Sequence, residues 1–207
     1  PWDIEAVRTV YETGVTSTRA NAPPLPQNLV ATATSETTIH ISWSASLGAV
    51  TYDLVRSTNN RTFTVIASIA GTSYTDTNRT PGTTYVYRVR ARNLKASSAY
   101  SHRDHATTVI FVDDPLVAGV TQIKAIHLIQ LRQAVNAVRV GAGFTPVTWT
   151  DSSPAGVEVK ALHINQLRNA LTPALNALGK PATYTDTITP GDPIRAIHFQ
   201  ELRNKTK

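Results

Sequence analysis

The chain has 207 residues, a formal net charge of +6, no cysteine, no methionine and only 16% charged residues. The absence of cysteine excludes disulfide bonds and thiol chemistry, and the charged fraction falls below the roughly 25% of an average soluble protein. Lysine and arginine form no basic run, and no apolar stretch approaches about 18 residues, so we expect neither nucleic-acid binding nor membrane insertion. Because the chain starts at Pro1, we expect a processed product or a piece of a longer protein.

Residues 1–22 give mixed signals about secondary structure. Asp3 is a candidate helix cap, whereas the stretch from Val7 to Tyr11 also fits a strand. We expect residues 1–22 to be either an N-terminal arm that docks elsewhere or the tail of a preceding domain. The prolines at 23, 24 and 26 exclude a helix and favour an extended link into the next domain.

Residues 23–108 consist of short alternating apolar and polar segments with turn residues every 8–12 positions, which is typical of a β-sandwich. The last long segment alternates in the same way. One face carries Tyr85, Tyr87, Val89 and Ala91, and the other carries Arg88, Arg90 and Arg92. This pattern predicts a strand with one face in the core and one face in solvent.

Several positions of this region together resemble a fibronectin type III domain. They are Pro24, Pro26, Asn28 and Leu29, then Trp43 and Tyr52, and finally Pro81-Gly-Thr-Thr-Tyr85 with Val89, Ala91 and Asn93. The resemblance covers about residues 24–108. It implies that Trp43 lies in the core between the sheets and that the Tyr85 hydroxyl bonds to nearby backbone, as in a tyrosine corner. We also expect Tyr52 in the core.

After a linker at 109–118, residues 119–207 repeat a nine-residue phrase three times. It reads Lys124-Ala-Ile-His-Leu-Ile-Gln-Leu-Arg132, then Lys160 to Arg168, then Arg195 to Arg203, with the histidines 36 and 35 residues apart. A fixed period of this length indicates a repeat whose units bury their apolar faces against one another. We therefore expect a small all-α domain of three units at 119–155, 156–190 and 191–207, the last one truncated.

Each unit is predicted to contain an amphipathic helix, with Leu131, Leu167 and Leu202 on the buried face. At 100° per residue, His127 falls on the rim of the apolar stripe and Arg132 at the edge of solvent. Pro173 predicts that the second helix ends or kinks near residues 171–172.

Two aromatic residues, Trp149 and Tyr184, follow the first two helices at equivalent places. We expect them to fill the apolar surface between neighbouring helices, and Asp151 and Asp186 to serve the turns that follow. The pattern Ile188-Thr-Pro190, Ile194-Arg-Ala and Leu202-Arg is also similar to the helical part of S-layer homology repeats. That family holds proteins to cell-wall polysaccharide, but the units here are shorter and lack its initial aromatic and acidic signature.

The repeated polar residues have two interpretations. His127, His163 and His198 would supply three metal ligands if they converged, or each would donate to a backbone carbonyl of the adjacent unit. No carboxylate recurs beside them in the sequence, so we favour the structural role and expect no metal and no other cofactor. The repeated basic pairs either bind anionic glycan or form contacts between units, and we favour the second role. These residues are Lys124, Arg132, Lys160, Arg168, Arg195 and Arg203.

No catalytic motif is present, and His102-Arg-Asp104-His105 is expected to be a solvated strand edge, so we expect no enzymatic activity. The sequence therefore predicts a structural or adhesive module of a secreted or cell-surface bacterial protein. Its expected partners are other copies of itself in a filament or surface layer, other surface proteins, or extracellular polysaccharide. The alternative is a spacer and glycan-binding region of a secreted polysaccharide-degrading enzyme, which exposed Trp2, Trp149 and Tyr184 would favour.

Overall fold

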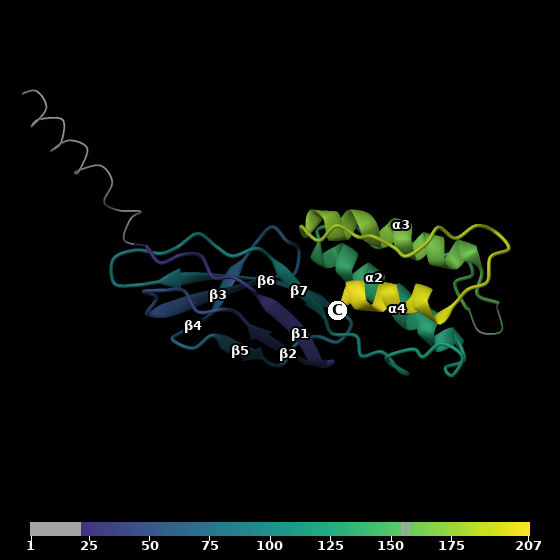
Figure 1. The fold of residues 1–207 in the computed structure, drawn as a ribbon, viewed down its shortest axis with the longest axis horizontal. Helices are drawn as coiled ribbons and strands as arrows, with labels where there is room; N and C mark the ends of the chain where they lie inside the picture. The colour runs from purple at the N-terminus through teal and green to yellow at the C-terminus, as the bar shows by residue number, and fades with distance from the viewer. Residues whose placement is uncertain (1–21, 155, 157) are drawn as a thin grey trace, which may run out of the picture.

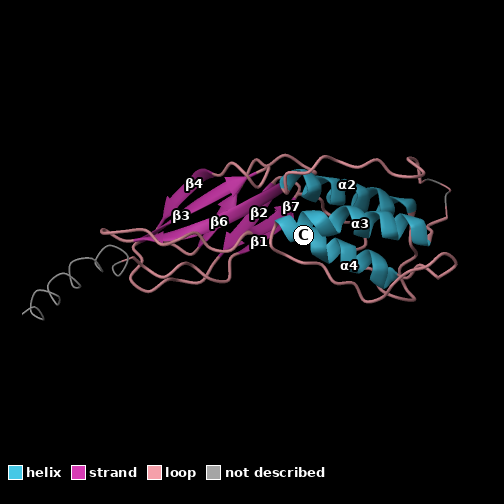
Figure 2. Cartoon of the chain, turned by 90° about the horizontal axis from the view of Figure 1, so that it is seen from above, coloured by secondary structure: helices cyan, strands magenta, loops and turns pink. Residues whose placement is uncertain are grey.

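The computed structural model describes residues 22–154, 156 and 158–207. The expected N-terminal arm, including Trp2, lies outside the described residues apart from residue 22. The described part consists of a two-sheet β-sandwich followed by three α-helices, arranged along the long axis of the molecule (Figures 1 and 2).

The sandwich is built from antiparallel strands in two sheets. One sheet has the order β1 (Val30–Ser35), β2 (Thr38–Ser42) and β5 (Ser73–Asp76). The other has the order β4 (Thr64–Ile69), β3 (Thr51–Ser57), β6 (Thr84–Arg92) and β7 (Asp104–Thr107). This arrangement agrees with the β-sandwich that the alternating pattern predicts.

The alternation along β6 decides which side chains enter the sandwich core. Tyr85, Tyr87, Val89 and Ala91 are buried between the sheets, together with Ile39, Ile41 and Leu54. The opposite face of β6 is divided. Arg88, Arg90 and Arg92 lie toward solvent, but Thr84 and Val86 are fully covered by the helices. The sequence pattern alone does not separate these two halves of the strand.

Three helices follow, α2 (Ala125–Gly141), α3 (Ala161–Ala177) and α4 (Ala196–Thr206). Each starts at the end of the molecule far from the sandwich and runs toward it, so the helices are parallel and extended segments return between them (Figure 1). They pack pairwise against one another. In α2 the apolar residues at 128, 131, 135 and 138 recur at helical spacing, which gives the stripe that the bundle buries.

The second helix does not end near residues 171–172, because α3 continues through Pro173 to Ala177. Two nearby backbone carbonyls accept side-chain hydrogen bonds, one at Arg168 from the Thr172 hydroxyl at 2.8 Å and one at Ala170 from Arg139 at 2.8 Å. The proline removes the backbone donor for the carbonyl of residue 169, four positions earlier, and the helix continues without that hydrogen bond.

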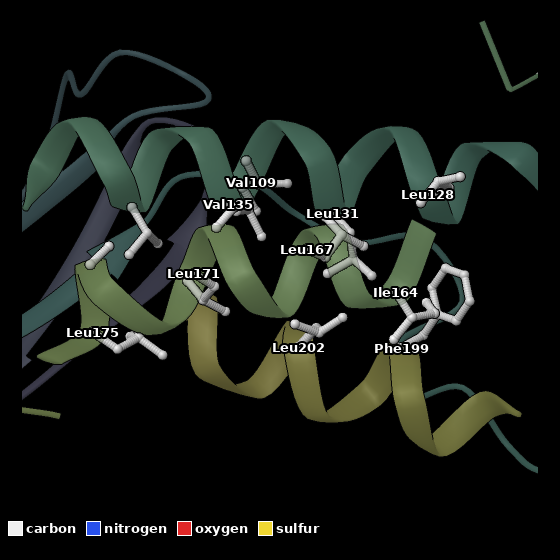
Figure 3. Close-up of a cluster of buried hydrophobic side chains, with 14 of the residues drawn as sticks. Val109, Leu128, Leu131, Val135, Ile164, Leu167, Leu171, Leu175, Phe199 and Leu202 are labelled. Carbon is white, nitrogen blue, oxygen red and sulfur yellow. The ribbon is translucent and has the colours of Figure 1, made fainter. Parts of the chain in front are cut away.

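The helices share one apolar core, part of which is shown in Figure 3. Leu128, Leu131, Ile164, Leu167 and Leu202 are fully buried in it. The core also includes Val86 from β6 and, from the segment expected to be a linker, Val109, Phe111 and Leu116. This segment is therefore anchored to the helices by three buried side chains, and the helical core is continuous with the outer face of the sandwich.

Candidate functional site: contacts that join the helices to one another and to the sandwich

The same polar arrangement stands at the start of each helix. The backbone N–H of Lys124 donates to His127 Nδ1 at 3.2 Å, and Lys160 and Arg195 donate to His163 and His198, both at 3.1 Å. Because each Nδ1 accepts a hydrogen bond, the imidazole proton sits on Nε2. These buried histidines therefore cap helix N-termini, rather than lying on the rim of the apolar stripe.

The Nε2 atom of each histidine faces its own carboxylate. The distances are 3.1 Å from His127 to Asp113, 2.9 Å from His163 to Asp151 and 3.1 Å from His198 to Asp186. The expected donation to a backbone carbonyl is wrong, and Asp151 and Asp186 bind the next helix rather than only serving a turn. A carboxylate does recur beside each histidine, but it comes from the preceding segment.

These contacts, together with burial, shift the pKa values of three of the residues, Asp113, Asp186 and His127. Hydrogen bonds from His127 and then Lys124 lower the pKa of Asp113. Burial raises the pKa of Asp186, but hydrogen bonds from His198 and Arg168 outweigh it, so that the net shift is downward. Burial lowers the pKa of His127 against the opposing hydrogen bond to Asp113. The pair of His127 and Asp113 therefore favours a neutral imidazole beside an ionised carboxylate.

A second recurring contact joins each helix to a neighbouring extended segment. The guanidinium of Arg132 lies 5.8 Å from the Trp149 ring centroid, that of Arg168 lies 4.6 Å from Tyr184, and that of Arg203 lies 4.9 Å from Phe111. Each also donates to a backbone carbonyl of that segment, at Asp151, Asp186 and Asp113 respectively, at 2.7, 2.7 and 2.9 Å. The arginines are 5%, 6% and 0% exposed, so the placement of Arg132 at the edge of solvent is wrong.

The three arginine contacts form a closed cycle among the helices. Arg132 of α2 binds the segment before α3, Arg168 of α3 binds the segment before α4, and Arg203 of α4 returns to the segment before α2. Amide side chains follow the same order, since Asn165 donates to the Ile188 carbonyl and Gln200 accepts from the Leu116 N–H. Among the described residues, the contacts of the three helices therefore form a closed ring.

Phe111-Val-Asp113 is the element that sequence reasoning missed. It has the same aromatic-x-Asp pattern as Trp149-Thr-Asp151 and Tyr184-Thr-Asp186, with the aromatic residues 38 and 35 positions apart. The signal was present in the sequence, but it precedes the first helix, in a stretch that reads as a linker.

The helices meet the sandwich through close backbone packing and polar contacts. A side chain at Gly141, the last residue of α2, would come within 2.8 Å of Thr84 at the start of β6. Asn60 donates to the Ala177 carbonyl at 3.1 Å, and Lys180 forms an ion pair with Asp104. The expected solvated edge at residues 102–105 is correct for the first two residues and wrong for the last two. His102 and Arg103 are exposed, whereas Asp104 and His105 are buried under the helices.

The other predicted site residues divide between core and surface. Lys124, Lys160 and Arg195 are exposed at the helix starts, and Lys124 and Arg195 pair with Asp113 and Asp186. Trp149 and Tyr184 are half-buried against the helical core. They offer no open aromatic platform for a glycan. The three histidines point to separate carboxylates, and within the described residues no group of three or more potential metal ligands occurs.

The aromatic residues of the sandwich pack as a fibronectin-like core requires. Trp43 meets Tyr52 edge to face, with ring centroids 5.6 Å apart. The Tyr85 hydroxyl accepts a hydrogen bond from the Thr80 N–H at 2.9 Å, which is the backbone contact of a tyrosine corner. Residues 24–104 match the family model described as Fibronectin type III domain. These residues form a fibronectin type III domain.

The relatives of this chain include an amylopullulanase and chitinases. It is 34% identical over 114 residues to an amylopullulanase of Thermoanaerobacterium saccharolyticum, a match that covers 53% of this chain and 9% of that protein. It is 36% identical over 75 residues to Chitinase 63 of Streptomyces plicatus, covering 35% of this chain and 12% of that protein. The chain thus spans about a tenth of the length of these relatives.

Among solved structures, the fibronectin region is similar to an Fn3-like protein from Clostridium thermocellum. The two share 36% sequence identity with a TM-score of 0.39, over 41% of this chain and 91% of that one. The similarity of the helices to S-layer homology repeats stays a prediction. Within the described residues, no helix is both long enough and apolar enough to cross a membrane.

Proposed function

We propose that this chain is a non-catalytic accessory region of a secreted polysaccharide-degrading enzyme, in which the fibronectin type III domain and the helices act together as a rigid spacer. The amylopullulanase and chitinase relatives support this role, and the chain matches only about a tenth of each of them. That share is in keeping with a module beside larger catalytic parts. We favour this role over assembly into a filament or surface layer.

The observation that carries the proposal is the continuous core between sandwich and helices. Val86 of β6 is fully buried in the same apolar cluster as Leu128, Leu131 and Val135 of α2. A spacer of two domains on a flexible linker would leave Val86, Phe111 and Leu116 in solvent, whereas all three are buried. Bending one part against the other would expose the buried side chains of Val86, Val109 and Phe111 to water. Such exposure costs ~25 cal/mol per Å² of apolar surface, so it opposes bending.

In this proposal the helices are three units of one repeat that closes as a ring. Each unit begins at its aromatic-x-Asp pattern rather than at the glycine turn, so residues 109–118 belong to the first unit instead of forming a linker. The revised organisation is a fibronectin type III domain over about residues 24–108 and a closed helical domain over 109–207.

A distance measurement across the whole molecule tests the spacer role. The chain has no cysteine, so Leu47→Cys and Val120→Cys provide unique dye sites at exposed positions, 89% and 80% accessible, one in each part. Single-molecule energy transfer should give one narrow distance distribution. A matched variant with ten Gly-Ser residues inserted after Thr108 should give a broad one. An equally broad distribution in both proteins would overturn the rigid spacer.

Self-assembly remains a second candidate because β4 lies at a sheet edge. Three of its six residues are exposed, and Val65 is 56% exposed. Such an edge can accept a strand from another copy or from another surface protein. Light scattering on residues 1–207 and 22–207 separates the two roles, because polymers that require residues 1–21 would favour assembly. A monomer of 22.4 kDa would favour the spacer.

A further inference from the structure

Beyond the edge of the helices, the outer face of β6 carries a strong local excess of positive charge. Arg90 and Arg92 share the single carboxylate of Asp53, at 2.8 and 3.4 Å. Arg88 and Arg103 have no ion-pair partner among the described residues. The Arg88 side chain donates only to the Ser101 carbonyl, at 3.3 Å. Of the four arginines at 88, 90, 92 and 103, only Arg90 and Arg92 therefore pair with a carboxylate among the described residues.

The two unpaired arginines line one concavity of about 280 Å³. Its walls include Leu25, Arg88, Tyr100, His102, Arg103 and Leu178. Tyr100 holds Arg88 in place beside Arg90, because the guanidinium carbons of these two residues lie 5.2 and 5.1 Å from its ring centroid. Burial and the charge of Arg103 both lower the pKa of Arg88. The two like charges thus destabilise each other across the concavity, and an anion would relieve that repulsion.

A structural explanation for these arginines is the nearby end of α3, whose partial negative charge attracts cations. The last carbonyls of this helix already have protein donors, however. Those of residues 174, 175, 176 and 177 accept hydrogen bonds from Leu178, Lys180, Gly179 and Asn60, respectively. Since neither Arg88 nor Arg103 is needed to satisfy them, their donor groups are available to a ligand.

We propose that this concavity binds a carboxylate-bearing sugar, a uronic acid residue of an acidic polysaccharide, with Arg88 and Arg103 holding the carboxylate. The guanidinium fork matches a carboxylate in geometry and charge. A cavity of this size accepts a ring-sized ligand, and Leu25, Leu178 and the Tyr100 ring provide apolar walls for the C–H face of the sugar. The site lies beyond the spacer role and does not depend on it.

The test is a titration of the 207-residue protein with trigalacturonate at low salt, followed by amide NMR shifts and calorimetry. We expect saturable binding with a Kd of about 1 mM or tighter, and shifts confined to residues near 88 and 100–103. Arg88→Gln and Arg103→Gln should each weaken binding at least about tenfold, because each removes a charge-assisted contact. Lys95→Gln removes the same charge from an exposed side chain and should leave binding unchanged.

Two further probes separate a sugar from a free anion. Maltotriose, which is neutral, should not bind, and Tyr100→Ala should weaken trigalacturonate more than sulfate. Equal binding of sulfate and trigalacturonate, unaffected by Tyr100→Ala, would mean an anion site without sugar recognition and would overturn the proposal. So would the absence of trigalacturonate binding up to about 10 mM. In that case Arg88→Gln is expected to change only the melting temperature.

Discussion

Replacing Phe111 by alanine tests whether the helices form a closed ring. Phe111 is 7% exposed within the helical core, so alanine removes a buried aromatic ring and leaves a cavity. It also removes the ring face beside Arg203, a contact at 4.9 Å that is worth about 1–2 kcal/mol when desolvated. Together these losses should lower the free energy of unfolding by about 3–5 kcal/mol.

For a chain of this size the melting temperature should fall by about 6–20 °C, at about 2–4 °C per kcal/mol. Calorimetry and urea unfolding followed by circular dichroism measure the effect. Val120→Ala, at a position 80% exposed in the same connecting segment, serves as control and should change stability by less than about 0.5 kcal/mol. A loss below about 1 kcal/mol for Phe111→Ala would show that residues 109–118 are a loose linker and that the ring is open.

Three other predictions follow from the same contacts. Val86→Lys places a charge in the joint core and should broaden the distance distribution between the sandwich and the helices, whereas an unchanged narrow distribution would contradict the shared core. Arg203→Ala should lower the free energy of unfolding in urea by about 2–4 kcal/mol. Arg203→Met fills the same space without a charge and should lower it by about 1 kcal/mol or less. Equal losses in the two variants would refute a packing role for this side chain. Burial, with the charge of Lys180, lowers the pKa of His105 to about 4. Because the unfolded chain binds this proton more readily, stability should be full above pH 6.5 and fall by about 2–3 kcal/mol toward pH 4.5, with a smaller fall in His105→Gln; identical slopes would be inconsistent with this origin.

The sequence was sufficient for the sandwich and for the three helices, because alternation and helical spacing are local patterns. Tyr85 and Val89 follow the alternation of a strand, and Leu131 and Leu167 follow the spacing of a helix. The sequence failed where burial depends on a distant partner. Val86 stands on the arginine-bearing face of β6, and only the helices make that position part of a core.

The candidate site was harder to predict than the fold. A helical wheel places Arg132 near solvent because it cannot include Trp149, which covers the guanidinium from another segment. The helix end predicted before Pro173 was wrong because buried residues on both sides of the proline, such as Leu171 and Ala174, hold α3 in the helical core. His127 pairs with Asp113, which lies 14 positions earlier in the chain. Aligning Phe111-Val-Asp113 with the two later aromatic-x-Asp patterns shows that a carboxylate precedes each helix, which is the sequence signal for this pairing.

The most direct test of the central claim, that the fibronectin type III domain and the helices form one rigid body, is a set of backbone residual dipolar couplings. The protein would be weakly aligned and couplings collected separately from residues 30–107 and 125–206. One alignment tensor should fit both sets in the orientation that Figure 1 shows. Two tensors of different magnitude would mean that the parts move independently, and the spacer would then be flexible.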